Sequence, residues 1–115
     1  MQSFYQKYIN RLKECGLYDE SNILFVTKWN ATIGASFITT FGDDLFITPY
    51  GYGDCTKRTS KINRNEIVNI DIKESFWTGT KIKFILKNGS TLKYSIVNKS
   101  WIDSAYRLKE WVNSK

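Results

Sequence analysis

The spacing of hydrophobic and polar residues along the chain predicts a helix first and strands afterwards. Near the N-terminus apolar residues recur at helical spacing, at Tyr5, Tyr8, Ile9 and Leu12, with polar residues between them. This spacing predicts an amphipathic helix over residues 3–15, which Ser3 can cap and Gly16 can end in the left-handed conformation. From residue 22 to 97 apolar and polar residues alternate, which is the period of β-strands.

The alternating region predicts about seven short strands joined by tight turns. We expect strands at residues 23–29, 32–41, 45–50, 55–62, 66–73, 80–87 and 91–97. Residues Ile33, Ala35, Phe37, Thr39 and Phe41 would share one face of the second strand. The fourth strand is polar and is therefore expected at a sheet edge. In the fifth strand Val68, Ile70 and Ile72 are expected to point inward, and Asn69, Asp71 and Lys73 outward.

The last two strands flank Asn88 and Gly89, a strong hairpin signal. A three-residue loop of Lys87, Asn88 and Gly89 separates apolar from charged residues cleanly, whereas a two-residue loop mixes them. With the three-residue loop, Ile82, Phe84 and Leu86 share a face with Leu92, Tyr94 and Ile96, while Lys81, Lys83 and Lys93 lie on the other face. We therefore predict a type I turn followed by a bulge at Gly89.

A second amphipathic helix is predicted over residues 100–113. Trp101, Ala105, Leu108 and Val112 form one apolar stripe, with Ile102 at its edge. Ser100 is the expected N-cap, and Asp103 in the first turn complements the helix dipole. The sequence thus predicts a single domain over residues 1–115, mainly β, with a helix at each end.

This layout resembles the pleckstrin-homology-like (PH-like) superfold, and in particular bacterial PH-like domains of the GRAM and YokE-like kind. The similarity is carried by Asp44–Thr48, by Ile62–Ile72, and by the hairpin from Lys81 to Tyr94. A helix before the strands also suits the small bacterial members. The resemblance implies a strongly bent, seven-stranded barrel or sandwich capped by the C-terminal helix. It also implies a binding or scaffolding role without catalysis.

The resemblance does not extend to a ligand. Members that bind phosphoinositides carry basic residues on and after the first strand. In this chain that region, residues 28–32, contains one lysine, Lys28. We therefore do not expect inositol phosphate to be the ligand, and fold likeness alone assigns no other.

Composition adds a basic balance to this picture. The chain of 115 residues has a net charge of +6 and a pI near 9.3. Such a balance favours an anionic partner, namely nucleic acid, an anionic membrane or an acidic protein, although dispersed lysines are also typical of an ordinary solvated surface. The first residues show no secretory signal pattern and no apolar run is long enough to span a bilayer. We therefore expect a cytoplasmic protein in which Cys15 and Cys55 are free thiols.

Catalysis is not expected. The chain has no histidine, which removes the usual general base, the usual metal ligand and any Ser–His or Cys–His pair. Asp43 and Asp44 follow Gly42 in a turn, and the glycines at 51 and 53 lack the strand-to-helix context of a phosphate loop. We expect neither a metal nor another cofactor.

Two segments are candidate binding sites. Lys57, Arg58, Lys61 and Arg64 place four basic residues in a short polar stretch suited to phosphate or nucleic acid, although a solvated, charge-protected edge strand explains the same pattern. Phe76 and Trp77 are adjacent aromatics in a loop, where they can anchor a partner or fold over an open end of the barrel. Trp111 can cover the rim of the sheet or meet a partner.

These features predict a small binding or protein-interaction module whose partner is another protein or a second copy of itself. One alternative is a basic protein that binds nucleic acid or a phosphorylated ligand through Lys57, Arg58, Lys61 and Arg64. Another is a structural subunit of a homo-oligomer that uses Trp111 and the edge strand.

Overall fold

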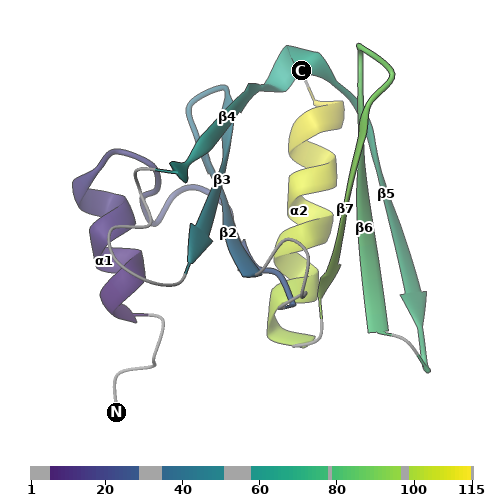
Figure 1. The fold of residues 1–115 in the computed structure, drawn as a ribbon, viewed down its shortest axis with the longest axis horizontal. Helices are drawn as coiled ribbons and strands as arrows, with labels where there is room; N and C mark the ends of the chain where they lie inside the picture. The colour runs from purple at the N-terminus through teal and green to yellow at the C-terminus, as the bar shows by residue number, and fades with distance from the viewer. Residues whose placement is uncertain (1–5, 29–34, 51–57, 78, 97–98, 115) are drawn as a thin grey trace.

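A computed structural model of the chain describes residues 6–28, 35–50, 58–77, 79–96 and 99–114. As the sequence predicts, the protein is mainly β with a helix near each end (Figure 1). In chain order the elements are α1 (Gln6–Glu14), β1 (Leu24–Val26), β2 (Ala35–Phe41), β3 (Asp44–Tyr50), β4 (Ser60–Asn63), the 3-10 turn η2 (Arg64–Glu66), β5 (Ile67–Ser75), β6 (Gly79–Leu86), β7 (Thr91–Ile96), the 3-10 turn η3 (Lys99–Trp101) and α2 (Ile102–Asn113).

Within the described residues the strands form two antiparallel sheets. One sheet has the order β1-β2-β3-β4 and the other has the order β5-β6-β7. The chain crosses between them through η2, where the Asn63 side chain accepts a hydrogen bond from the Asn65 N–H at 2.9 Å. A second link joins the segment after β1 to β7, where the Lys28 N–H donates to the Ser95 carbonyl at 2.6 Å. The sheets share no ladder in this part of the chain, so they do not form a closed barrel.

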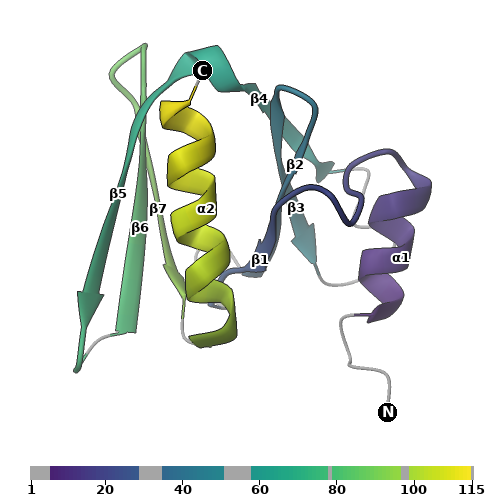
Figure 2. The ribbon, with the colours of Figure 1, turned by 180° about the vertical axis from the view of Figure 1, so that it is seen from behind.

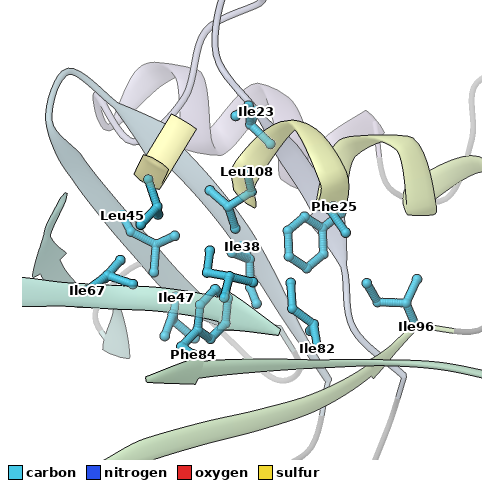
Figure 3. Close-up of a cluster of buried hydrophobic side chains, with 13 residues drawn as sticks. Ile23, Phe25, Ile38, Leu45, Ile47, Ile67, Ile82, Phe84, Ile96 and Leu108 are labelled. Carbon is cyan, nitrogen blue, oxygen red and sulfur yellow. The ribbon is translucent and has the colours of Figure 1, made fainter. Parts of the chain in front are cut away.

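Helix α2 packs between the two sheets and completes the main core (Figures 1 and 2). Buried residues of both sheets point into one shared space, and Leu108 enters it from α2 (Figure 3). The members at or near zero exposure include Phe25, Ile38, Leu45, Ile67, Ile70, Ile82, Phe84, Ile96, Ala105, Leu108 and Val112. Burial of this apolar surface is the main force that holds the sheets and the helix together.

Helix α1 lies on the far side of the first sheet and covers its outer face (Figure 2). Leu12, Leu24, Val26 and Phe37 form a second buried cluster there. Gly16, with φ of +73°, ends the helix as the sequence predicts. The Gly16 N–H donates to the Lys13 carbonyl and the Leu17 N–H to the Leu12 carbonyl, which is the Schellman arrangement.

Because α1 covers the outer face of the first sheet, strand β2 is buried on both of its faces. Its described residues Ala35 to Thr40 are all buried. Phe37 and Ala35 belong to the face that the sequence singles out, and Phe37 packs against α1 in the second cluster. Ile38, on the opposite face, enters the main core. A strand covered on both sides carries apolar residues on both faces, so alternation alone does not identify the core face.

The hairpin prediction is confirmed in its loop length and register. Ile82 lies opposite Tyr94, and Phe84 lies opposite Leu92. The Leu86 N–H donates to the Ser90 carbonyl, which leaves three residues in the loop. Gly89 has φ of +87°, the left-handed conformation that the predicted bulge requires.

Two local predictions are wrong. Alternation predicts that Val68 points inward, but a bulge between Ile67 and Asn69 shifts the register and leaves Val68 53% exposed, while Ile67 is buried in its place. The sequence predicts Ser100 as the cap of the last helix, but Ser100 lies inside η3, and α2 begins after Trp101 with no side-chain cap. Trp101, the last residue of η3, packs against both buried clusters.

Candidate interaction surface

The two aromatic residues predicted in a loop lie at the tip of the β5–β6 hairpin. Ser75 and Gly79 are the last paired residues of the two strands, and Gly79 has φ of +80° at the turn. Phe76 is 91% exposed and Trp77 is 88% exposed. Their ring centroids lie 5.2 Å apart in an edge-to-face contact, a favoured geometry for aromatic pairs. The two rings therefore do not fold over the end of the sheets, and they project into solvent.

The tip is at a corner of the molecule, on the side opposite α1 (Figures 1 and 2). The Trp77 N–H donates to the Ser75 hydroxyl at 3.3 Å, which helps to hold the turn. On the inner side of the hairpin, the Tyr106 hydroxyl of α2 donates to the Glu74 carboxylate at 2.8 Å. This hydrogen bond raises the pKa of the Tyr106 hydroxyl above its usual value. It also ties the strand next to the tip to α2, so the tip extends from a braced strand.

Behind the tip, the outer face of the second sheet is rich in lysine. Because Ile82 and Phe84 point into the core, the neighbouring residues of β6 point outward. Lys81 lies opposite Lys73 on β5, and Lys83 lies between Asp71 on β5 and Lys93 on β7. We call Lys73, Lys81, Lys83 and Lys93 the lysine face. Asp71 is the one carboxylate in these cross-strand rows of the described strands.

The lysine face is not one of the binding sites that the sequence predicts. Alternation predicts that Lys81, Lys83 and Lys93 share an outer face, and that Lys73 points outward from its own strand. The sequence does not predict the register that places Lys73 beside Lys81, directly behind Phe76 and Trp77. Long-range pairing of this kind leaves no local signal in one sequence.

The basic segment singled out in the sequence is divided in the structure. Arg58 and Lys61 are exposed, Lys61 on β4 at the edge of the first sheet, and Lys57 lies outside the described residues. Arg64 is different, because its side chain is only 17% exposed. The Arg64 side chain is therefore mostly buried, whereas Arg58 and Lys61 are exposed to solvent.

Arg64 joins three parts of the fold. Its backbone N–H donates to the Asp43 carbonyl at 2.8 Å, and its Nη1 lies 3.4 Å from the Asp43 carboxylate. Its Nη2 donates to the Ser114 hydroxyl at 2.8 Å, and the guanidinium carbon lies 5.1 Å from the centroid of the Trp111 ring. The β2–β3 turn, η2 and the end of α2 are thus held by one side chain. Trp111 is half-buried beneath it and packs against the main core.

We expect Arg64→Ala to lower the free energy of unfolding by about 1–3 kcal/mol, because it removes charge-assisted hydrogen bonds from a largely buried site. The exposed Arg58→Ala is the matched control and should change stability by less than about 0.5 kcal/mol. Urea unfolding followed by circular dichroism measures both. Equal midpoints for the two variants would contradict the joining role of Arg64.

The described residues hold no group of three histidine, cysteine, aspartate or glutamate side chains placed to bind a metal. Nor is any helix in that part of the chain long and apolar enough to cross a membrane. The thiol of Cys15 is free and exposed, and Cys55 lies outside the described residues. A scan against protein-family models finds no match to this chain, and a search of curated proteins finds none either.

Proposed function

We propose that this protein is a non-catalytic binding module that engages a macromolecular partner through Phe76 and Trp77. The observation that carries the proposal is the exposure of two adjacent large aromatic side chains, 91% and 88%, at the tip of one hairpin. Water-exposed aromatic surface of this size contributes nothing to the core, and its burial by a partner is favourable. Aromatic residues, tryptophan in particular, are also enriched among the residues that dominate binding energy.

The geometry of the tip favours binding over a structural role. Phe76 and Trp77 touch each other edge-to-face. The neighbouring strand is braced by the hydrogen bond from Tyr106 to Glu74. A pre-organised pair of rings loses little conformational freedom when it meets a partner, which favours affinity.

A PH-like architecture is part of the same proposal. A four-stranded sheet followed by a three-stranded sheet, with the C-terminal helix packed between them, supports it. The Lys81–Tyr94 hairpin, which carries much of the resemblance, has the predicted loop and register. A binding role without catalysis agrees with this architecture and with the absence of histidine from the chain.

We expect Phe76→Ala/Trp77→Ala to abolish partner capture without changing stability, because both side chains are exposed. The purified protein is incubated with native-host lysate after nuclease treatment, and captured proteins and lipids are identified by mass spectrometry. Phe41→Ala is the matched control, since Phe41 is a partly exposed ring on the other sheet, 40% accessible. Retention of the same partners by the double variant would overturn the proposal.

A further inference from the structure

We infer that the partner of the tip is an anionic lipid bilayer, with Phe76 and Trp77 entering the membrane interface and the lysine face contacting the headgroups. The inference rests on the proposed function, since it names the partner of the same tip. It is carried by the order of chemical groups along the β5–β6 hairpin. Aromatic side chains stand at the extreme end, and cationic side chains follow behind them on one face.

The spacing along the hairpin matches the depth of layers in a membrane surface. Lys73 and Lys81 lie opposite each other two residues behind the last pair, Ser75 and Gly79. At the rise of a β-strand this row is about 7 Å behind that pair, and the row of Lys83 is about 14 Å behind it, with the two rings beyond the pair. Tryptophan favours the interface between water and lipid, while lysine side chains reach the headgroup level.

Charge at the tip agrees with an anionic surface. The four residues of the lysine face are accompanied by one carboxylate, Asp71, in the same cross-strand rows. Glu74, the carboxylate nearest the tip on β5, pairs with the buried Thr80 and therefore belongs to the inner side, where it accepts the Tyr106 hydroxyl. The carboxylate of Glu74 is thus kept off the outer face, where the four lysines outnumber Asp71 and each lysine adds attraction to an anionic leaflet.

A bilayer fits this arrangement better than nucleic acid does. Proteins that bind single-stranded nucleic acid interleave aromatic rings with basic residues along one groove, so that bases stack while phosphates are neutralised. Here the outward rows behind the tip contain lysines, Asp71, Asn69, Ile85, Thr91 and Ser95 and no aromatic residue. The rings stand exposed at one end of the hairpin, which suits entry into a fluid interface.

The test is flotation with vesicles of phosphatidylcholine alone and with phosphatidylcholine and phosphatidylserine in a roughly two-to-one mixture, at low salt. We expect the protein to bind the mixed vesicles and not the neutral ones. Lys73→Gln/Lys81→Gln should weaken binding about thirtyfold, since each lysine near the surface is worth roughly fivefold. Phe76→Ala/Trp77→Ala should weaken it at least about tenfold, because aromatic surface is no longer transferred from water.

A matched control tests whether binding depends on the position of the lysine face or only on the net positive charge of the protein. Lys7 lies on α1 and Lys87 lies in the loop at the other end of β6, and both are exposed. Lys7→Gln/Lys87→Gln lowers the net charge from +6 by the same amount as the test pair, but should leave vesicle binding unchanged within about twofold. A blue shift of tryptophan fluorescence on adding mixed vesicles, absent in Trp77→Phe, would place Trp77 in the interface.

Three results would overturn the inference. One is no binding to either kind of vesicle, another is equal weakening by the control pair, and the third is tighter binding to a thymidine oligonucleotide that the same tip and lysine variants abolish. If vesicles do not bind but the tip variants still abolish capture of a protein, the proposed function stands and the bilayer does not. If the tip variants change neither binding, both are wrong.

Discussion

We expect Phe84→Ala to lower the free energy of unfolding by about 3–5 kcal/mol, a large part of the whole stability of a domain this size. Phe84 is completely buried in the main core. Its ring lies 6.0 Å from that of Tyr94 in a tilted, edge-type contact. Removal of the ring leaves a cavity between two sheets and a helix, which cannot all close on it while keeping their strand pairings.

Urea unfolding followed by far-ultraviolet circular dichroism measures this loss. Phe76→Ala is the matched control, because it removes the same side chain from a position that is 91% exposed. We expect that control to change the free energy of unfolding by less than about 0.5 kcal/mol. Similar losses for the two substitutions would mean that the sheets and α2 do not share one core.

The second large effect is expected from Leu12→Ala, at about 2–5 kcal/mol. Leu12 is the fully buried residue of α1 and packs with Leu24, Val26 and Phe37 on the outer face of the first sheet. The helix is held further by the Leu17 carbonyl, which accepts the Thr39 hydroxyl at 2.8 Å. Without Leu12 the helix loses its main anchor, and its short length gives it little stability of its own.

Hydrogen exchange of the α1 amides, together with urea unfolding, tests this. Lys7→Ala on the exposed side of α1 is the control, since it alters the same helix without touching the sheet. We expect fast exchange across α1 in Leu12→Ala and near wild-type protection in Lys7→Ala. Unchanged stability and unchanged protection in Leu12→Ala would show that α1 is not docked on this sheet in solution.

Local sequence signals predicted most of the fold. The helix end at Gly16 and the loop of Lys87, Asn88 and Gly89 follow from conformations that glycine adopts at little cost, and both are confirmed. The stripe of Ala105, Leu108 and Val112 is buried as the helical period predicts. Where local rules failed, tertiary contacts replaced them: a bulge turned Val68 outward, and α2 begins without the expected Ser100 cap.

The interaction surface needed more than local signals. Two adjacent aromatics in a loop have no period, so the sequence left open whether Phe76 and Trp77 anchor a partner or cover the end of the sheets. Because both rings are exposed, they do not cover the end of the sheets. In the sequence Arg64 is grouped with Arg58 and Lys61 in one basic segment. Nothing in that segment indicates that Asp43 and Ser114 hold the Arg64 side chain in the folded protein.

By itself, the sequence determined the order and type of the elements, because hydrophobic period, turn residues and glycine conformations act over a few neighbouring residues. Only the tertiary structure decided which face of β2 meets the core, that two sheets remain separate, and that Lys73 stands beside Lys81 behind an exposed aromatic tip. These features depend on pairing between distant segments. The free energy of that pairing comes from surface buried across the whole domain, which no short stretch of sequence records.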